Sequence, residues 1–139
     1  MSSNIDATTQ SAQALGSGIT ISNLSKTFKI GKEKIVAIDN ASLHSDKGSF
    51  LSLLGPSGCG KSTILRILAG LETPTSGFAT VDGKDPQDLR KNHELGIAFQ
   101  DSALLPWRSV ESNIKLPLEI SGEELDPKVL ADIIKLVGL

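Results

Sequence analysis

The sequence predicts an α/β fold whose N-terminal part is an antiparallel β-sheet. Two stretches of alternating apolar residues, at 18–24 and 34–44, flank a polar turn that contains a glycine, which is the pattern of a β-hairpin. Further along, an apolar run at 49–55 is followed by a glycine-rich loop and a helical pattern, which is the order strand, loop, helix. With 139 residues, of which 39% are hydrophobic, the chain is long enough for one domain with a buried core.

The first half of the chain is expected to contain a hairpin, a buried strand and a helix, each predicted from its own local pattern. The second strand of the hairpin has a predicted break near residues 39–40, where the apolar alternation changes phase. The run SFLSLLG at 49–55 is apolar on both sides, which predicts a strand buried on both faces, as strands of parallel sheets are. Apolar residues at helical spacing predict a helix at 61–69, and Gly70 suits its end.

The second half ends in a well-marked helix. Asp126 can cap its N-terminus, Pro127 suits the first helical position, and Gly138 suits its end. We expect, in order, a strand at 78–82, a second buried strand at 95–100, a helical pattern at 110–120 that Pro117 interrupts, and the helix at 126–138.

Residues 55–63, GPSGCGKST, match the pattern of a phosphate-binding loop: Gly, four residues, then Gly-Lys-Ser/Thr. Glycines let backbone N–H groups converge on a polyphosphate, and the following helix adds its free N–H groups and the positive end of its dipole. Lys61 is predicted to reach the β- and γ-phosphates, and the Ser62 hydroxyl to bind Mg²⁺. The alternative, a glycine-rich turn that happens to contain a lysine, does not account for the strand before it and the helix after it. The predicted phosphate-binding residues are Gly55, Pro56, Ser57, Gly58, Cys59, Gly60, Lys61, Ser62 and Thr63.

The stretch GPSGCGKSTILRILAGLETPTSG at 55–77 resembles the phosphate loop, helix and turn of the ATP-binding subunit of ATP-binding cassette (ABC) transporters. The resemblance covers roughly residues 18–139, and VGL at 137–139 is similar to the end of a helix in that family's helical subdomain. It implies a P-loop NTPase of the ABC ATPase type that binds ATP and Mg²⁺. The implied organisation is a disordered leader at 1–18, the N-terminal part of the nucleotide-binding domain at 19–121, and the start of the helical subdomain at 122–139.

Two shorter segments carry further site residues through this resemblance. LSKTFK places Phe28 where the family has an aromatic ring that stacks on adenine, and IAFQD places Gln100 at the family's Q-loop glutamine. The resemblance therefore implies that Phe28 binds the nucleotide and that Gln100 serves in catalysis and at the metal, together with Lys61 and Ser62. From the residues alone, Phe28 could equally be a core residue of the hairpin, and Gln100 a polar residue at the end of a strand.

A third segment, LLPWRSVESNI at 104–114, resembles the region after that glutamine in importers of sulfonates, taurine and nitrate. The resemblance implies an importer subunit that pairs with a membrane-spanning permease and with a second ATP-binding subunit, and indirectly with a substrate-binding protein. Its expected location is cytoplasmic, at the inner face of the cell membrane.

Three other catalytic segments of the family are not found in this sequence. They are the LSGGQ signature, an Asp-Glu pair that follows four apolar residues, and a histidine that comes later in the family's sequences. EISGEE at 119–124 is similar to the signature only superficially. The sequence thus resembles the N-terminal part of an ABC ATPase, ending before the signature motif, and we expect it not to hydrolyse ATP alone. The alternatives are a stand-alone P-loop nucleotide-binding module or other P-loop NTPase, with Asp101 as the metal-side carboxylate, and a structural interaction fragment without ATP affinity.

Composition bears on four further properties: a nucleic-acid partner, disulfide bonds, membrane spans and a signal peptide. The net charge of −2 gives no reason to expect a nucleic-acid partner. The single cysteine, Cys59, cannot form an internal disulfide, which fits a reducing compartment. No apolar stretch approaches the ~20 residues that a membrane span needs, and residues 1–18 lack the basic start and apolar core of a signal peptide.

Overall fold

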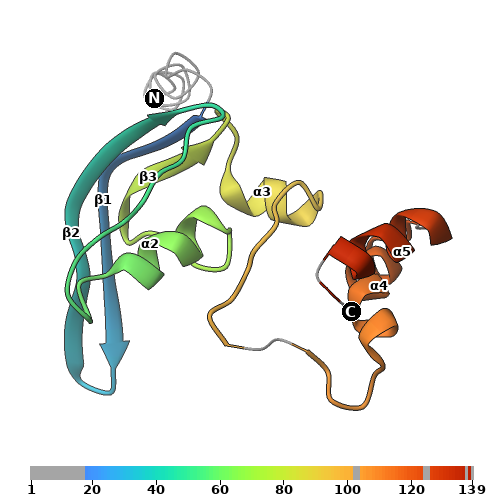
Figure 1. Cartoon of the computed structure of the whole chain (residues 1–139). Helices are drawn as coiled ribbons and strands as arrows, with labels where there is room; N and C mark the ends of the chain where they lie inside the picture. Colours follow the sequence, from blue (N-terminus) through green and yellow to red (C-terminus); the bar gives the residue numbers. More distant parts are fainter. Residues whose placement is uncertain (1–17, 102–103, 124–125, 137, 139) are drawn as a thin grey trace, which may run out of the picture. The chain divides into compact units, whose positions relative to one another are not determined.

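The computed structural model describes residues 18–101, 104–123, 126–136 and 138 (Figure 1). The chain divides into two compact units, Met1–Ile97 and Ala98–Leu139, and each is described by itself. The predicted leader at 1–18 lies outside the described residues except for Gly18, which begins the first strand. The predicted domain boundary after residue 121 stays a prediction.

The described strands of the first unit form an antiparallel sheet in the order β2-β1-β3 (Figure 1). β1 spans Gly18–Ile30, β2 spans Glu33–Asp46, and β3 spans Ser76–Val81. β1 and β2 form a hairpin, so the predicted hairpin and the predicted strand at 78–82 are confirmed.

The break predicted near residues 39–40 is an irregularity of pairing, because β2 itself continues through these residues. The register between β1 and β2 shifts between Ile21 and Thr27. Asn23 and Asn40 have left-handed backbones, with φ of 46° and 50°, and the Asn23 side-chain amide donates to Asn40 Oδ1 at 3.0 Å. Asparagine tolerates this conformation better than most residues, so the irregularity has a local cause in the sequence.

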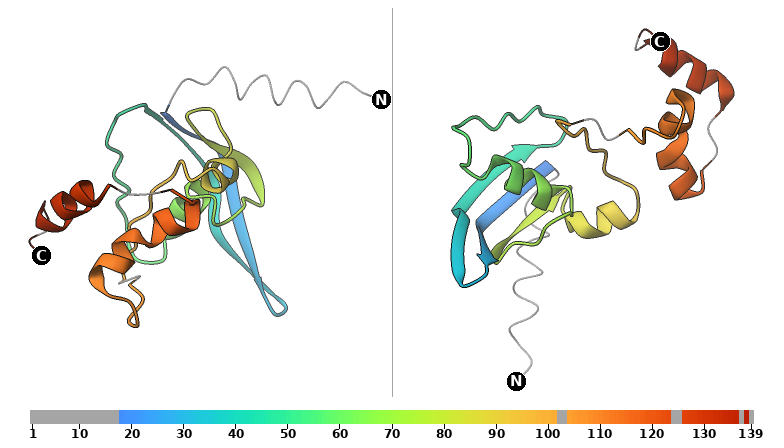
Figure 2. Two further views of the ribbon diagram at one scale, coloured as in Figure 1. Left: turned by 90° about the vertical axis from the view of Figure 1, so that its right-hand side faces the viewer. Right: turned by 90° about the horizontal axis from the view of Figure 1, so that it is seen from below.

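The core of the first unit lies between the sheet and helix α2, Lys61–Leu68, which confirms the helix predicted at 61–69 (Figure 2). α2 buries Ile67 to 2% exposure, and Gly70 follows the helix with φ of 66°. The side chains of this core are Ile21, Leu24, Ile38, Ile67 and Ala79.

A short helix that the sequence patterns above do not predict, α3, spans Pro86–Lys91. Asp85 caps it by accepting a hydrogen bond from the Gln87 N–H at 2.7 Å, and Leu89 is buried. The signal was present, because Asp85-Pro86 repeats the cap-and-proline pair that predicted the last helix.

Both predicted buried strands, at 49–55 and 95–100, are wrong for the structure described here, since neither segment has strand pairing. Phe50 is 95% exposed and Leu54 is 89% exposed. A strand of a parallel sheet has no hydrogen bonds within itself and forms only beside partner strands. None of the described strands pairs with either segment, and most of their apolar residues are exposed, although Leu53 and Leu95 are half-buried.

The second unit contains α4, Val110–Ser121, and α5, Pro127–Leu136. α4 continues through Pro117, so its helical pattern is confirmed although the proline does not end it. Asp126 Oδ1 accepts from the Lys128 N–H at 2.8 Å, which confirms the predicted cap of α5. Within the described ranges, no helix combines the length and the apolar content that crossing a membrane requires.

Candidate phosphate-binding site

The glycine-rich loop leads directly into α2 and leaves the N-terminus of that helix open. Gly60 is the residue before the helix, with φ of 91° and ψ of 0°, and no side chain caps the helix. Gly58 also has a left-handed backbone, with φ of 80°. The first N–H groups of a helix have no acceptor within it, and they carry the positive end of the helix dipole. The loop therefore has the geometry of an anion site.

Gly60 lets this loop lie directly on the sheet. A Cβ atom at Gly60 would clash with the backbone carbonyl oxygen of Ala37 and would lie 3.3 Å from Cγ1 of Ile38. Both neighbours belong to β2, and Ile38 is part of the core that also contains Ile67 of α2. The start of α2 is thus held against β2 by backbone contact that only glycine allows.

Lys61 is folded back over the loop. Its Nζ donates to the carbonyl oxygens of Gly55 and Pro56, at 2.8 and 2.6 Å, and to the Cys59 sulfur at 3.3 Å. These contacts use all three hydrogens of the ammonium group. A thiol is the weakest acceptor of the three, so a phosphate oxygen would replace Cys59 at the least cost in free energy.

Ser62 and Thr63 occupy the first turn of α2 beside Lys61. Ser62 is exposed and Thr63 is half-buried, and in the described part of the chain neither hydroxyl has a protein partner. Open N–H groups, one cation and two hydroxyls are a donor set suited to a polyphosphate with its Mg²⁺. The residues of the loop therefore fit the predicted ligand, and their individual roles stay predictions.

Phe28 lies on β1 opposite Ile35 of β2. It is half-buried and is not one of the buried core residues, and the Lys26 ammonium lies over its ring at 4.9 Å from the centroid. Ile35 is only two residues before Ala37, the residue that Gly60 contacts. Phe28 and the loop therefore lie beside the same stretch of β2, which is compatible with the predicted adenine contact.

Gln100 and Asp101 belong to the second unit, whereas the loop belongs to the first. Because each unit is described by itself, the catalytic and metal roles predicted for Gln100 stay predictions. Among the described residues, no group of three or more His, Cys, Asp or Glu side chains is arranged to hold a metal ion.

Asp82 has a structural role. Its Oδ1 accepts from the Gly18 N–H at 2.8 Å, and its Oδ2 pairs with Lys47 Nζ at 3.1 Å. The hydrogen bond from Lys47, followed by that from Gly18, holds the pKa of Asp82 below its ordinary value of 3.8. These contacts join the start of β1 to the turn after β3.

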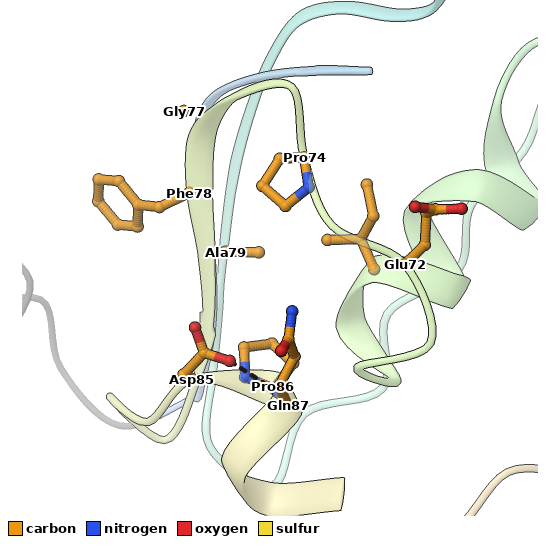
Figure 3. A pocket seen from close by; sticks show the side chains of 9 residues that line it. Glu72, Pro74, Gly77, Phe78, Ala79, Asp85, Pro86 and Gln87 are labelled. Atoms are coloured by element: carbon orange, nitrogen blue, oxygen red, sulfur yellow. Dashed lines mark hydrogen bonds between the residues drawn. The ribbon is translucent and has the colours of Figure 1, made fainter. Parts of the chain in front are cut away.

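A pocket of about 170 Å³ lies between the loop after α2, β3 and α3 (Figure 3). Glu72 and Pro74 line one side of it and Phe78 lies on β3, while Asp85 and Gln87 belong to the start of α3. Sites for ligands of drug size usually enclose about 300–1,000 Å³. This pocket is smaller than that and includes no residue of the glycine-rich loop, so we do not assign the nucleotide to it.

Comparison with known proteins gives consistent matches. A sequence model of the family described as "ABC transporter" matches residues 38–139. An uncharacterized ABC transporter ATP-binding protein of Methanocaldococcus jannaschii is 38% identical over 123 residues, covering 87% of this chain and 45% of the relative. The methionine import ATP-binding protein of Pasteurella multocida is 41% identical over 130 residues, covering 87% of this chain and 38% of the relative.

Two further matches extend the comparison. The spermidine/putrescine import ATP-binding protein of Thermobifida fusca is 37% identical over 135 residues, covering 94% of this chain and 35% of the relative. A dimeric ATP-binding cassette in a post-hydrolysis state, bound to ADP and Pi, superposes with a TM-score of 0.70 at 32% identity, covering 81% of this chain and 52% of that one. The chain thus spans less than half of the length of these curated relatives.

Proposed function

This chain belongs to the ABC transporter family, and from that premise we propose that it is the ATP-binding part of an importer's energising subunit, with Mg-ATP held at residues 55–63. One observation carries the proposal: the loop presents the uncapped N-terminus of α2 together with the Lys61 ammonium. Both features attract the β- and γ-phosphates, and both lie on one stretch of the chain whose residues are exposed or half-buried.

Each site residue has a definite task under this proposal. The N–H groups of the loop and of the first turn of α2 donate to the phosphates, and Lys61 exchanges its contact with Cys59 for a phosphate oxygen. The Ser62 hydroxyl binds Mg²⁺, and the ion, when bound, neutralises phosphate charge. Phe28 stacks on adenine, and Gln100 serves at the metal.

We infer that binding and turnover are separable in this chain. Ground-state contacts at the loop hold the nucleotide, whereas rate acceleration needs groups directed at the attacking water and at the charge that develops in the transition state. The sequence contains neither the LSGGQ signature nor the Asp-Glu pair. Turnover is therefore proposed to require a second ATP-binding subunit and the longer sequence that the curated relatives possess.

The proposed partners are a membrane-spanning permease, a second ATP-binding subunit and, indirectly, a substrate-binding protein, at the cytoplasmic face of the membrane. The names of two relatives describe import of methionine and of spermidine or putrescine, which supports an importer. A small anion such as sulfonate, taurine or nitrate is proposed as substrate from the segment at 104–114 alone.

Calorimetric titration with Mg-ATP tests the phosphate site. Lys61→Ala should weaken binding by about 10- to 150-fold, because a charge-assisted contact to phosphate contributes about 1.5–3 kcal/mol. Lys32→Ala, which removes the same charge from the exposed hairpin turn, should bind as the wild type does. Unchanged affinity in a folded Lys61→Ala variant would refute the assignment.

Phosphate release measured on the same proteins tests the second part of the proposal. We expect no steady turnover from the 139-residue chain. Robust turnover that disappears in Lys61→Ala would overturn that expectation. It would favour the stand-alone P-loop NTPase, with Asp101 as the metal-side carboxylate.

A further inference from the structure

Lys26 is a nearly buried lysine whose contacts the phosphate site does not explain. It is only 9% exposed. Its Nζ donates to Glu72 Oε1 and to the Thr73 carbonyl oxygen, both at 2.7 Å, and it lies over the ring of Phe28 at 4.9 Å from the centroid. Removing an ammonium group from water costs free energy unless it is paired and hydrogen-bonded. Here a carboxylate, a carbonyl and an aromatic face provide that compensation.

These contacts join two parts of the site that are distant in sequence. Glu72 and Thr73 follow α2, the helix that begins directly after the glycine-rich loop. Lys26 lies on β1, two residues before Phe28. Lys26 also pairs across the sheet with Ile38, the residue beside Gly60. The ammonium group thus connects the element that presents phosphate donors to the strand that carries the aromatic ring.

The position of the cation over the ring restricts what the ring can do. A cation within about 6 Å of an aromatic centroid is attracted to the ring face. One face of Phe28 is therefore occupied by Lys26, and the opposite face is the one left for a second planar group. Hydrogen bonds from Lys26 to Glu72 and Thr73 hold the ammonium group in this position over the ring.

We propose that Lys26 is a positioning residue for adenine: anchored by Glu72 and Thr73, it holds the Phe28 ring so that its free face stacks on the purine. This inference rests on the proposed function, because it requires that the loop binds ATP. Lys26 itself touches no phosphate under this proposal, so its effect is confined to the base of the nucleotide.

Titration of the 139-residue chain with Mg-ATP and with Mg-triphosphate, which lacks the base, separates these contributions. Lys26→Met removes the cation and keeps a long side chain, and it should weaken ATP binding about two- to tenfold, as expected for loss of an aromatic stacking contact. Triphosphate binding should not change. Lys26→Arg keeps the cation and should bind ATP with the affinity of the wild type. Lys29 is an exposed lysine on the same strand, and Lys29→Met should change the affinity for neither ATP nor triphosphate.

Phe28→Ala separates failure of this inference from failure of the proposed function. Suppose that Phe28→Ala lowers the affinity for ATP but not for triphosphate, and that Lys26→Met lowers neither affinity. The ring then stacks without help from Lys26, and the inference is wrong. Equal losses of ATP and triphosphate in Lys26→Met would also overturn it, since Lys26 would then only stabilise the loop. No ATP binding by the wild type would refute both proposals.

A second variant covers the case in which Lys26→Met does not give the wild-type circular dichroism spectrum. Glu72→Gln keeps the shape of the anchoring residue and weakens its hold on Lys26. It should reduce ATP affinity in the same direction and by a smaller factor, again without a change for triphosphate. An ATP affinity equal to that of the wild type would overturn the anchoring role.

Discussion

Replacement of Gly60 by alanine tests how the phosphate loop is held on the sheet. Gly60 has φ of 91°, and an added Cβ would clash with the Ala37 carbonyl oxygen and press on Ile38. Gly58→Ala is the matched control, because Gly58 has φ of 80° but no atom within 4 Å of an added Cβ. The two variants carry a similar backbone penalty, and only Gly60→Ala adds a clash with β2.

The expected magnitudes can be estimated from these geometries. A left-handed backbone costs a residue with a Cβ about 1–2 kcal/mol relative to glycine. Forcing an extra carbon into a packed contact adds about 1–3 kcal/mol. We therefore expect Gly58→Ala to lower the free energy of unfolding by about 1–2 kcal/mol and Gly60→Ala by about 2–5 kcal/mol.

Urea unfolding followed by circular dichroism measures both values on the 139-residue chain. A change in midpoint with an unchanged slope would report stability alone. Equal destabilisation by the two variants would refute the reasoning, because the contact of Gly60 with Ala37 would then contribute nothing. Greater destabilisation by Gly58→Ala would contradict it still more directly.

Two further predictions concern the loop thiol and an anchoring carboxylate. Cys59 is exposed and is the chain's single cysteine, so maleimide labelling reports on it alone. Mg-ATP should slow that labelling, whereas equal rates with and without nucleotide would place the ligand elsewhere. The hydrogen bond from Lys26, followed by that from the Thr73 N–H, holds the pKa of Glu72 below its ordinary value of 4.5. This stabilisation is complete above the unfolded-state pKa and is lost as the pH falls through the folded-state pKa. Urea midpoints at about pH 7 and about pH 3 should therefore differ less for Glu72→Gln than for the wild type, and equal differences would show that Glu72 does not contribute.

Local patterns predicted the parts of this fold that depend on neighbouring residues. The hairpin requires alternation and a turn, and α2 requires apolar spacing and a glycine at each end, so both could be predicted from the sequence. The segments at 49–55 and 95–100 were different, because a parallel strand depends on partners distant in sequence. Their apolar composition suits a buried strand, but it does not specify which strands pair with them.

The same distinction applies to the site. The loop at 55–63 is contiguous, so its residues could be identified from one pattern. Gln100 was identified through family resemblance alone, and the structure leaves its approach to the loop untested. Lys26 was missed, because its anchor Glu72 lies 46 residues away, and nothing in LSKTFK marks that pairing.

The position of the phosphate loop therefore depends more on helix α2, after the loop, than on the apolar run before it. Leu54, directly before the loop, is 89% exposed and is not part of the core. By contrast, Gly60 contacts β2, and Ile67 of α2 is buried in the core. Lys26 adds a second connection by binding the segment after α2. Both ends of α2 are thus joined to the β1–β2 hairpin. Changes in that hairpin should alter nucleotide affinity more than changes in the apolar run at 49–54, although that run is adjacent to the loop in sequence.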